Sequence, residues 1–234
     1  MISFFAVEAH KETLTLREIA RGMIQRIRNP LNALQLHVDN LEDEITEVHI
    51  ENSLKRLKRI RNTIGELDSL LCEVLRLVDL PKPQITSINI NALVREVETF
   101  ARPEASKKGL TIKVDLRENM PEIQADPIQI KQAILNLVLN AIENSPFKGS
   151  VTLATETKSD HIMIKVGDNG EGIPLAERDR IFEPFFSTKE GGIGLGLPLA
   201  LEIVRMHRGR ISVTSEVGKG NTFIISLPVK VDMG

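Results

Sequence analysis

The sequence is poor in aromatic residues, with eight Phe, no Trp and no Tyr among its 234 residues. The core must therefore be aliphatic, and we do not expect nucleobases to be bound by stacking on an aromatic platform. The single cysteine, Cys72, excludes an internal disulfide framework and any cysteine-rich metal site. A chain of this kind is typical of a reducing, cytoplasmic compartment.

An excess of one charge and a long apolar run are also lacking. Thirty Lys and Arg stand against 32 Asp and Glu, so the formal net charge is −2, and we expect no nucleic-acid partner. No apolar run approaches the ~18 residues of a membrane span, and the N-terminus lacks the basic-then-apolar pattern of a secretory signal. Hydrophobic residues make up 41% of the chain, which is ordinary for a folded, soluble protein.

Two stretches in the first third of the chain carry apolar residues at alternating steps of three and four. They run from Leu16 to Val48 and from Ile50 to Val78, with a turn expected near His49–Ser53. This spacing is typical of long helices that pack along a seam. One helical hairpin cannot fully bury both apolar seams, whereas two copies of the hairpin packed together can. We therefore expect an antiparallel helical hairpin over residues 1–80 that forms a homodimeric four-helix bundle.

The periodic pattern ends at Pro81-Lys82-Pro83, because two prolines prevent a helix from continuing. We place a linker at 81–89 and a second domain at 90–234. Its strand and helix patterns predict an α+β sandwich with mainly antiparallel connections. Strands are expected at 84–88, 110–116, 122–125, 151–156, 161–166, 210–214 and 222–227, and helices at 91–108, from Asp126-Pro127 onward, and from Gly192 to about His207.

Four polar or glycine-rich motifs stand at the ends of these elements. Asn136 and Asn140 share one face of an apolar helix, where their amides need partners such as a hydrated magnesium ion that carries phosphates. Asp168 follows a strand, opens Asp-Asn-Gly-Glu-Gly, and can accept a hydrogen bond from the exocyclic amine of adenine. Gly191–Gly196 opens a helix whose backbone N–H groups can cradle phosphate. Gly218–Thr222, taken alone, is a plain hairpin turn.

Each motif by itself is weak evidence, but their order and spacing make the set specific. Together they resemble the ATP-binding catalytic domain of bacterial sensor histidine kinases, within the wider GHKL (Bergerat) family of gyrase, Hsp90 and MutL. Asn136–Ala141 resembles the N box, Asp168–Gly172 the first glycine box, Ile181–Lys189 the F box and Gly192–Gly196 the second glycine box. The fold expected for residues 90–234 is accordingly an α/β sandwich of the GHKL type.

The resemblance implies ATP and Mg²⁺ as ligands, with Asp168 reading adenine and Asn140 binding the magnesium ion. It also implies a lid at about Ser187–Gly192 that closes over the triphosphate, with Lys189 as its cation. The predicted nucleotide-site residues are Asn136, Asn140, Asp168, Gly170, Gly172, Lys189, Gly192, Gly194, Gly196 and Thr222.

The hairpin resembles the dimerisation and histidine-phosphotransfer domain of the same family, whose signature is His-Glu-x-x-Asn-Pro-Leu. This chain has Gln25-Arg26-Ile27-Arg28-Asn29-Pro30-Leu31, so Asn29 and the helix-kinking Pro30 match and the first two positions differ. A glutamine amide is not a useful nucleophile, because its nitrogen lone pair is delocalised into the carbonyl. Arg26 is permanently protonated and cannot take the proton that the usual Glu takes. The residue that autophosphorylates is therefore missing.

Three functions remain open at this point. We predict a degenerate histidine kinase of two-component signal transduction, a pseudokinase that binds ATP and regulates a genuine histidine kinase or a response regulator. In the second possible function, the chain is an active kinase that phosphorylates a partner's His in trans. The intact nucleotide motifs favour this activity. In the third, it is a phosphatase of a phosphorylated receiver domain. There Gln25 and Asn29, one helical turn apart, would orient the attacking water while Arg26 offsets phosphate charge.

Overall fold

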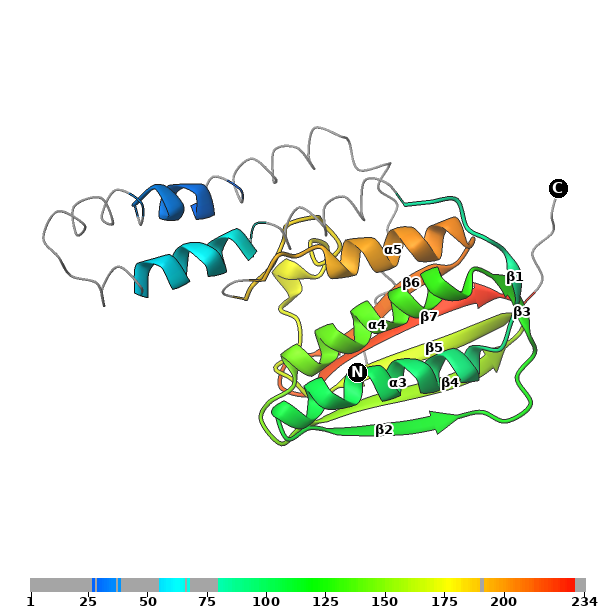
Figure 1. The fold of residues 1–234 in the computed structure, drawn as a ribbon. Coiled ribbons are helices and arrows are strands. Elements are labelled where there is room, and N and C mark those ends of the chain that lie inside the picture. The colour runs from blue at the N-terminus through cyan, green and yellow to red at the C-terminus, as the bar shows by residue number, and fades with distance from the viewer. Residues whose placement is uncertain are drawn as a thin grey trace, which may run out of the picture. The chain divides into compact units, whose positions relative to one another are not determined.

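The computed structural model describes residues 27, 29–36, 38, 55–65, 67, 80–189 and 192–229, which fall into two separate units (Figure 1). In the first unit, residues 29–36 and 55–65 are helical, and Pro30 lies within the first of these stretches. The turn predicted near 49–53 lies outside the described residues, as do Gln25 and Arg26.

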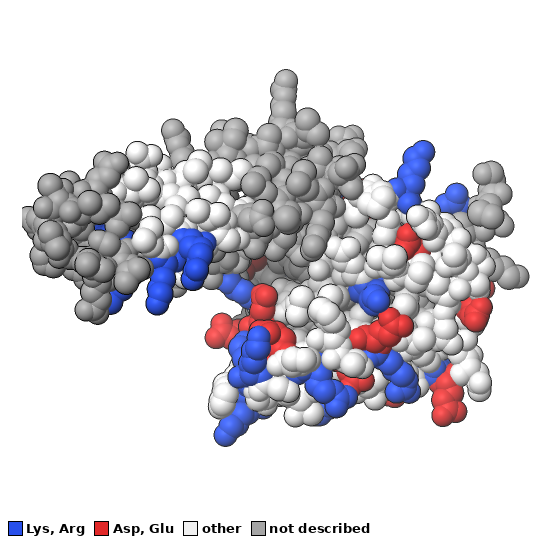
Figure 2. All heavy atoms as spheres, viewed as in Figure 1, with Lys and Arg blue, Asp and Glu red and all other residues white. Residues whose placement is uncertain are grey.

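Apolar side chains of the predicted seams are exposed in this first unit. Leu31, Leu57 and Ile64 are 50%, 49% and 53% exposed within the single chain. Basic side chains gather beside them along 55–65, whereas both charge signs are interspersed on the second unit (Figure 2). The described seam residues therefore leave apolar surface open to water within the single chain.

The second unit is a two-layer sandwich, and in its described residues three helices cover one face of a five-stranded sheet (Figure 1). The sheet order is β2-β4-β5-β7-β6, with β2 and β4 parallel and the other neighbours antiparallel. The α+β sandwich with mainly antiparallel connections is thus confirmed. Its strands are β2 (Thr111–Leu116), β4 (Ser150–Lys158), β5 (His161–Asp168), β6 (Arg210–Glu216) and β7 (Gly220–Pro228), and its helices are α3 (Ile90–Lys107), α4 (Pro127–Asn144) and α5 (Gly196–Met206).

The buried face of the sandwich is almost entirely aliphatic, as the composition predicted. Side chains alternate between buried and accessible along β5 and β7, so one face of each strand packs against the helices. Phe223 is the one aromatic residue among the largest fully buried side chains of the described residues, and the others are Ile and Leu. Helix α4 contacts both α3 and α5 and lies over β4 and β5, so it is the middle helix of the layer.

Asp126 fixes the N-terminal end of α4. Its carboxylate accepts hydrogen bonds from the backbone N–H groups of Ile128 and Gln129, as a helix N-cap does, and from Gln84 in the preceding segment. Burial tends to raise the pKa of Asp126, but these N–H donors outweigh burial and leave its pKa lowered. A small sheet of β1 (Thr86–Ile88) and β3 (Ile123–Ala125) joins the same region.

The sequence prediction placed one helix start wrongly. We expected the last helix from Gly192, whereas α5 begins at Gly196. Gly194 has a φ of +73°, which an α-helix cannot contain, so the glycine-rich stretch remains a loop until that residue is passed. The loop-rich stretch before it also holds a short 3₁₀ helix at Leu175–Glu177.

Candidate nucleotide site

The N box and the second glycine box meet through a direct hydrogen bond. The side-chain amide of Asn136, on α4, donates to the backbone carbonyl of Gly196 at the start of α5, with 3.1 Å between the nitrogen and the oxygen. Asn140 lies one helical turn further along the same face of α4, and its side chain is half-buried. The two Asn residues therefore line the part of α4 that borders the start of α5.

The start of α5 has the features of an anion site. No side chain in the described part of the chain caps this helix, so its first backbone N–H groups keep their capacity to donate. A Cβ added at Gly196 would have no described atom within 4 Å, so packing of the protein does not demand glycine there. The open space beside uncapped N–H groups, next to Asn136, fits a phosphate group.

A backbone contact closes the base of the predicted lid. The N–H of Phe185, in the F box, donates to the carbonyl of Gly194 at 3.0 Å. A Cβ on Gly194 would collide with the carbonyl oxygen of Phe186, so glycine is required there by close approach as well as by its positive φ. The F box and the second glycine box thus meet at Phe185 and Gly194, and residues 190–191 of the predicted lid lie outside the described residues.

Lys189, in the predicted lid, reaches the C-terminal half of α4. Its ammonium nitrogen lies 2.8 Å from a carboxylate oxygen of Glu143, which is three residues beyond Asn140. Both side chains remain partly exposed, so the pair contributes little to stability. The contact nevertheless brings this part of the predicted lid next to the end of α4 that follows the N box.

The first glycine box packs against two other segments. A Cβ on Gly170 would collide with the backbone carbonyl of Asn144, at the end of α4, and one on Gly172 would collide with that of Glu216 on β6. Gly172 also has a φ of +80°. Glycine is therefore required at both positions, because the loop after β5 packs closely against the backbone of α4 and β6.

Asp168 is buried, and its carboxylate is held by its own loop and by β7. Its carboxylate accepts from the N–H of Gly170 at 2.9 Å, from the backbone N–H of Asn221 at 3.2 Å and from the Asn221 side-chain amide at 3.1 Å. We predicted Thr222 from this motif and missed Asn221. Residues alternate along β7, so Asn221 shares the buried face with Phe223, while Thr222 lies on the other face, opposite Gly167. That alternation was the signal available in the sequence.

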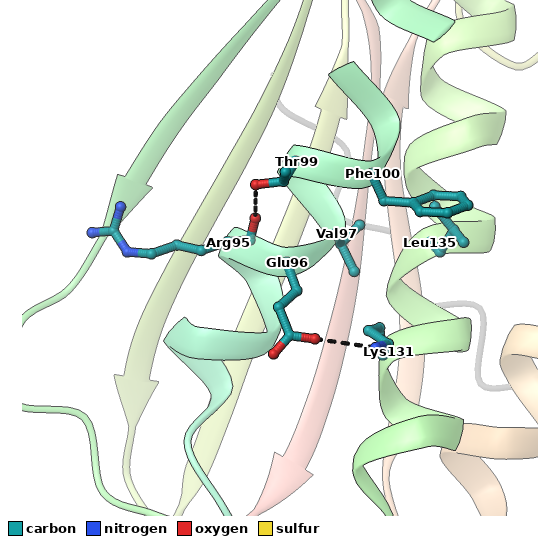
Figure 3. A pocket seen from close by; sticks show the side chains of 7 residues that line it. All are labelled: Arg95, Glu96, Val97, Thr99, Phe100, Lys131 and Leu135. Carbon is teal, nitrogen blue, oxygen red and sulfur yellow. Dashed lines mark hydrogen bonds and ion pairs between the residues drawn. The ribbon is translucent and has the colours of Figure 1, made fainter. Parts of the chain in front are cut away.

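Two hollows lie on the surface of the second unit. One, of about 310 Å³, includes Asp168 and Thr222 in its lining, together with Thr152, Lys165 and Gly167. A larger one, of about 550 Å³, lies between α3 and α4 (Figure 3). There the ring of Phe100 lies beside Leu135, with the Glu96–Lys131 ion pair below. No predicted nucleotide-site residue lines this larger hollow, so we do not assign it to the nucleotide.

Asn140 is the residue best suited to a magnesium ion. No group of three or more His, Cys, Asp or Glu among the described residues could hold a metal, so a protein-only metal cage is not found there. Magnesium is often held by one or two protein oxygens together with phosphates and waters, which an accessible amide oxygen beside a phosphate cradle fits. Asn29 is exposed on a helix of the first unit, separate from the unit that holds these residues.

The sandwich and the motifs around the end of α4 define a GHKL-type ATPase domain. In agreement, residues 125–231 match the family described as histidine kinase-, DNA gyrase B-, and HSP90-like ATPase. Sporulation kinase C of Bacillus subtilis (strain 168) is 33% identical over 231 residues, which are 97% of this chain and 52% of that protein. The chain spans about half the length of the curated relatives it matches.

Solved structures give the same result. The catalytic domain of histidine kinase ThkA is 31% identical, with a TM-score of 0.58 over 62% of this chain and 96% of that one. ThkA in complex with response regulator protein TrrA is 26% identical, with a TM-score of 0.74 over 92% of this chain and 62% of that one. Full-length ShkA in complex with AMPPNP is 26% identical, with a TM-score of 0.69 over 94% of this chain and 47% of that one.

The chain therefore belongs to the histidine kinase family, as its motifs predicted, and carries the ATPase domain of that family. The described helices include none that is both long and apolar enough to cross a membrane.

Proposed function

We propose that this chain binds ATP with Mg²⁺ at the end of α4 and regulates two-component signalling without phosphorylating itself. The observation that carries the nucleotide site is the convergence of the motifs, above all the hydrogen bond from Asn136 to the Gly196 carbonyl. In this site Asn140 binds Mg²⁺, the start of α5 receives phosphate, Lys189 contacts the triphosphate from the lid, and Asp168 accepts from the adenine amine.

The regulatory part of the proposal rests on Gln25 and Arg26. A family member with intact nucleotide motifs but neither the nucleophile nor the base at the phosphorylation site cannot phosphorylate itself there. We infer that it acts on a response regulator receiver domain or on a genuine histidine kinase. The complex of ThkA with a response regulator supports the first of these partners. The exposed seam residues Leu31, Leu57 and Ile64 support a homodimer through the hairpin.

The two other functions remain alternatives with separate support. Kinase action in trans is supported by the motifs themselves, because a scaffold without phosphotransfer has no evident need for Mg–ATP. Phosphatase action is supported by the sequence around Gln25 and Asn29, whose spacing of four residues would put their amides one turn apart on a helix.

One experiment separates the three. The full chain is incubated with ATP labelled at its γ-phosphate, alone and with candidate histidine kinases and phosphorylated receivers. A regulator gives no label on the chain and still changes the extent to which a partner kinase labels itself from the ATP. Partner labelling that disappears with Asn140→Ala identifies a kinase acting in trans. Receiver dephosphorylation that is lost with Gln25→Ala or Asn29→Ala identifies a phosphatase.

A further inference from the structure

A chain of hydrogen bonds runs from Ile173, directly after the first glycine box, through β6 and β7 to the carboxylate of Asp168 in that box. The backbone N–H of Ile173 donates to the Ser215 hydroxyl on β6, with 2.7 Å between the two atoms. The Ser215 hydroxyl donates in turn to the side-chain oxygen of Asn221 on β7, also at 2.7 Å. The Asn221 side-chain nitrogen then donates to both oxygens of Asp168 at 3.1 Å.

The chain fixes which way the Asn221 amide faces. Ser215 accepts from Ile173, so its single hydroxyl hydrogen remains for the Asn221 oxygen. The NH₂ group of Asn221 must then point to Asp168, because an ionised carboxylate can only accept hydrogen bonds. Asn221 is 5% exposed and Asp168 is 8% exposed, so water cannot easily replace either partner.

The contacts on Asp168 are unequal between its two oxygens. Oδ1 accepts from the N–H of Gly170 and from both the backbone and side-chain nitrogens of Asn221, whereas Oδ2 accepts from the Asn221 side chain alone. A carboxylate oxygen offers about two lone-pair directions. Oδ1 is therefore fully used, and Oδ2 keeps the capacity for one more donor.

We propose that Asn221 and Ser215 are positioning residues that hold Asp168 so that Oδ2 faces the nucleobase and selects adenine over guanine. This inference rests on the proposed nucleotide site and adds to it the residues that set base preference. Adenine presents an amine, which donates to Oδ2. Guanine presents a carbonyl at the same ring position, and a carboxylate that cannot turn away opposes it with two acceptors face to face.

The test compares affinities for ATP, GTP and inosine triphosphate in the full chain by calorimetry. Asn221→Leu keeps the approximate side-chain volume and removes both the donor and the acceptor. Ser215→Ala removes only the hydroxyl, and Ser215→Thr keeps it. Ser212→Ala is the matched control, because Ser212 lies on the opposite face of the same strand.

For the unaltered chain we expect ATP to bind at least about tenfold more tightly than GTP or inosine triphosphate, which both carry the carbonyl. Asn221→Leu should reduce the ATP-to-GTP preference by about tenfold or more, mainly through weaker ATP binding. Without Asn221 the Asp168 carboxylate is no longer held in place, so its hydrogen bond with the adenine amine is weakened. Ser215→Ala should reduce the preference in the same direction, Ser215→Thr should retain it, and Ser212→Ala should leave it unchanged.

The proposal is overturned if Asn221→Leu and Ser215→Ala, shown to be folded by thermal unfolding, keep the preference of the unaltered chain. It is also overturned if they weaken ATP and GTP equally, because that is the signature of a structural role only. If Asn221→Leu does not fold, the three Ser215 and Ser212 variants decide the outcome. Failure of the unaltered chain to bind any of the three nucleotides overturns the proposed nucleotide site itself, whereas binding without base preference overturns only this inference.

Discussion

Asn136 and Gly196 are 60 residues apart in sequence and joined by one hydrogen bond, from the Asn136 side-chain amide to the Gly196 carbonyl at 3.1 Å. The bond holds the N-box helix against the uncapped start of α5. Asn140 lies one turn beyond Asn136 on α4, so an ion held by Asn140 would lie near phosphates held by α5. The first predictions follow from this arrangement.

Replacing Asn140 by Ala should abolish the magnesium-dependent part of ATP binding. The side chain is half-buried and contributes an amide oxygen that alanine lacks. We expect ATP affinity with Mg²⁺ to fall to the level that the unaltered chain shows with a chelator, a loss of about tenfold or more for one metal ligand. Calorimetry with and without Mg²⁺ measures this. A variant that keeps the full magnesium effect would assign the ion to another residue.

Gly196→Ala and Gly194→Ala should fail for different reasons. A Cβ at Gly196 enters open space, so the variant should unfold at the temperature of the unaltered chain but bind ATP more weakly, because the methyl group occupies the phosphate cradle. At Gly194 the positive φ alone costs about 1–3 kcal/mol, and the Cβ collides with the Phe186 carbonyl. Thermal unfolding with and without ATP separates the two, and equal loss of stability at both positions would contradict the prediction.

Neutralising Glu143 should strengthen ATP binding. Its carboxylate lies 2.8 Å from the ammonium nitrogen of Lys189, so Glu143 competes with the triphosphate for this cation. Because Glu143 is on the helix that carries Asn140, its negative charge also repels the triphosphate. We expect Glu143→Gln to raise ATP affinity a few-fold and Lys189→Gln to lower it, with stability changed by less than about 1 kcal/mol in each case. Both effects should shrink at high salt. A decrease in affinity for Glu143→Gln would show that Glu143 supports the site.

Asp126 should make the stability of the second unit depend on pH. Its pKa is lowered from 3.8 in the folded chain, because backbone N–H donors outweigh its burial. A carboxyl group with a lowered folded pKa contributes its full stabilisation above the unfolded value and loses it as the pH falls through the folded value. Denaturant unfolding should therefore show Asp126→Ala about 1 kcal/mol or more less stable at pH 7, with the difference shrinking below about pH 3.8. A constant difference from pH 7 to pH 2.5 would exclude the linkage.

The fold of the second unit was predictable because its signals are local. Asp126-Pro127 is a cap followed by a first-turn proline, and the alternation in 161–166 is that of a half-buried strand. The start of α5 was misplaced because the backbone angle of Gly194 depends on its close approach to Phe186, a contact distant from any local pattern. Motif matching predicted Thr222 and did not predict Asn221, although the alternation along β7 separates the faces of these two residues; the contact of Asn221 with Asp168 depends on the pairing of β7 with β5.

Restoring the signature in the first helix tests the regulatory proposal most directly. Gln25→His supplies a ring nitrogen that can attack phosphorus, and Arg26→Glu supplies the base that takes its proton. If the nucleotide site and hairpin are otherwise competent, the double variant should label itself from ATP marked at the γ-phosphate. The single variant Gln25→His should do so at least about tenfold more slowly, because general base catalysis contributes roughly that or more. Adding Asn140→Ala to the double variant should remove the label, which ties the reaction to the site on α4. Self-labelling of the unaltered chain, surviving in Gln25→Ala, would mean that another residue accepts the phosphate and that the chain is an active kinase.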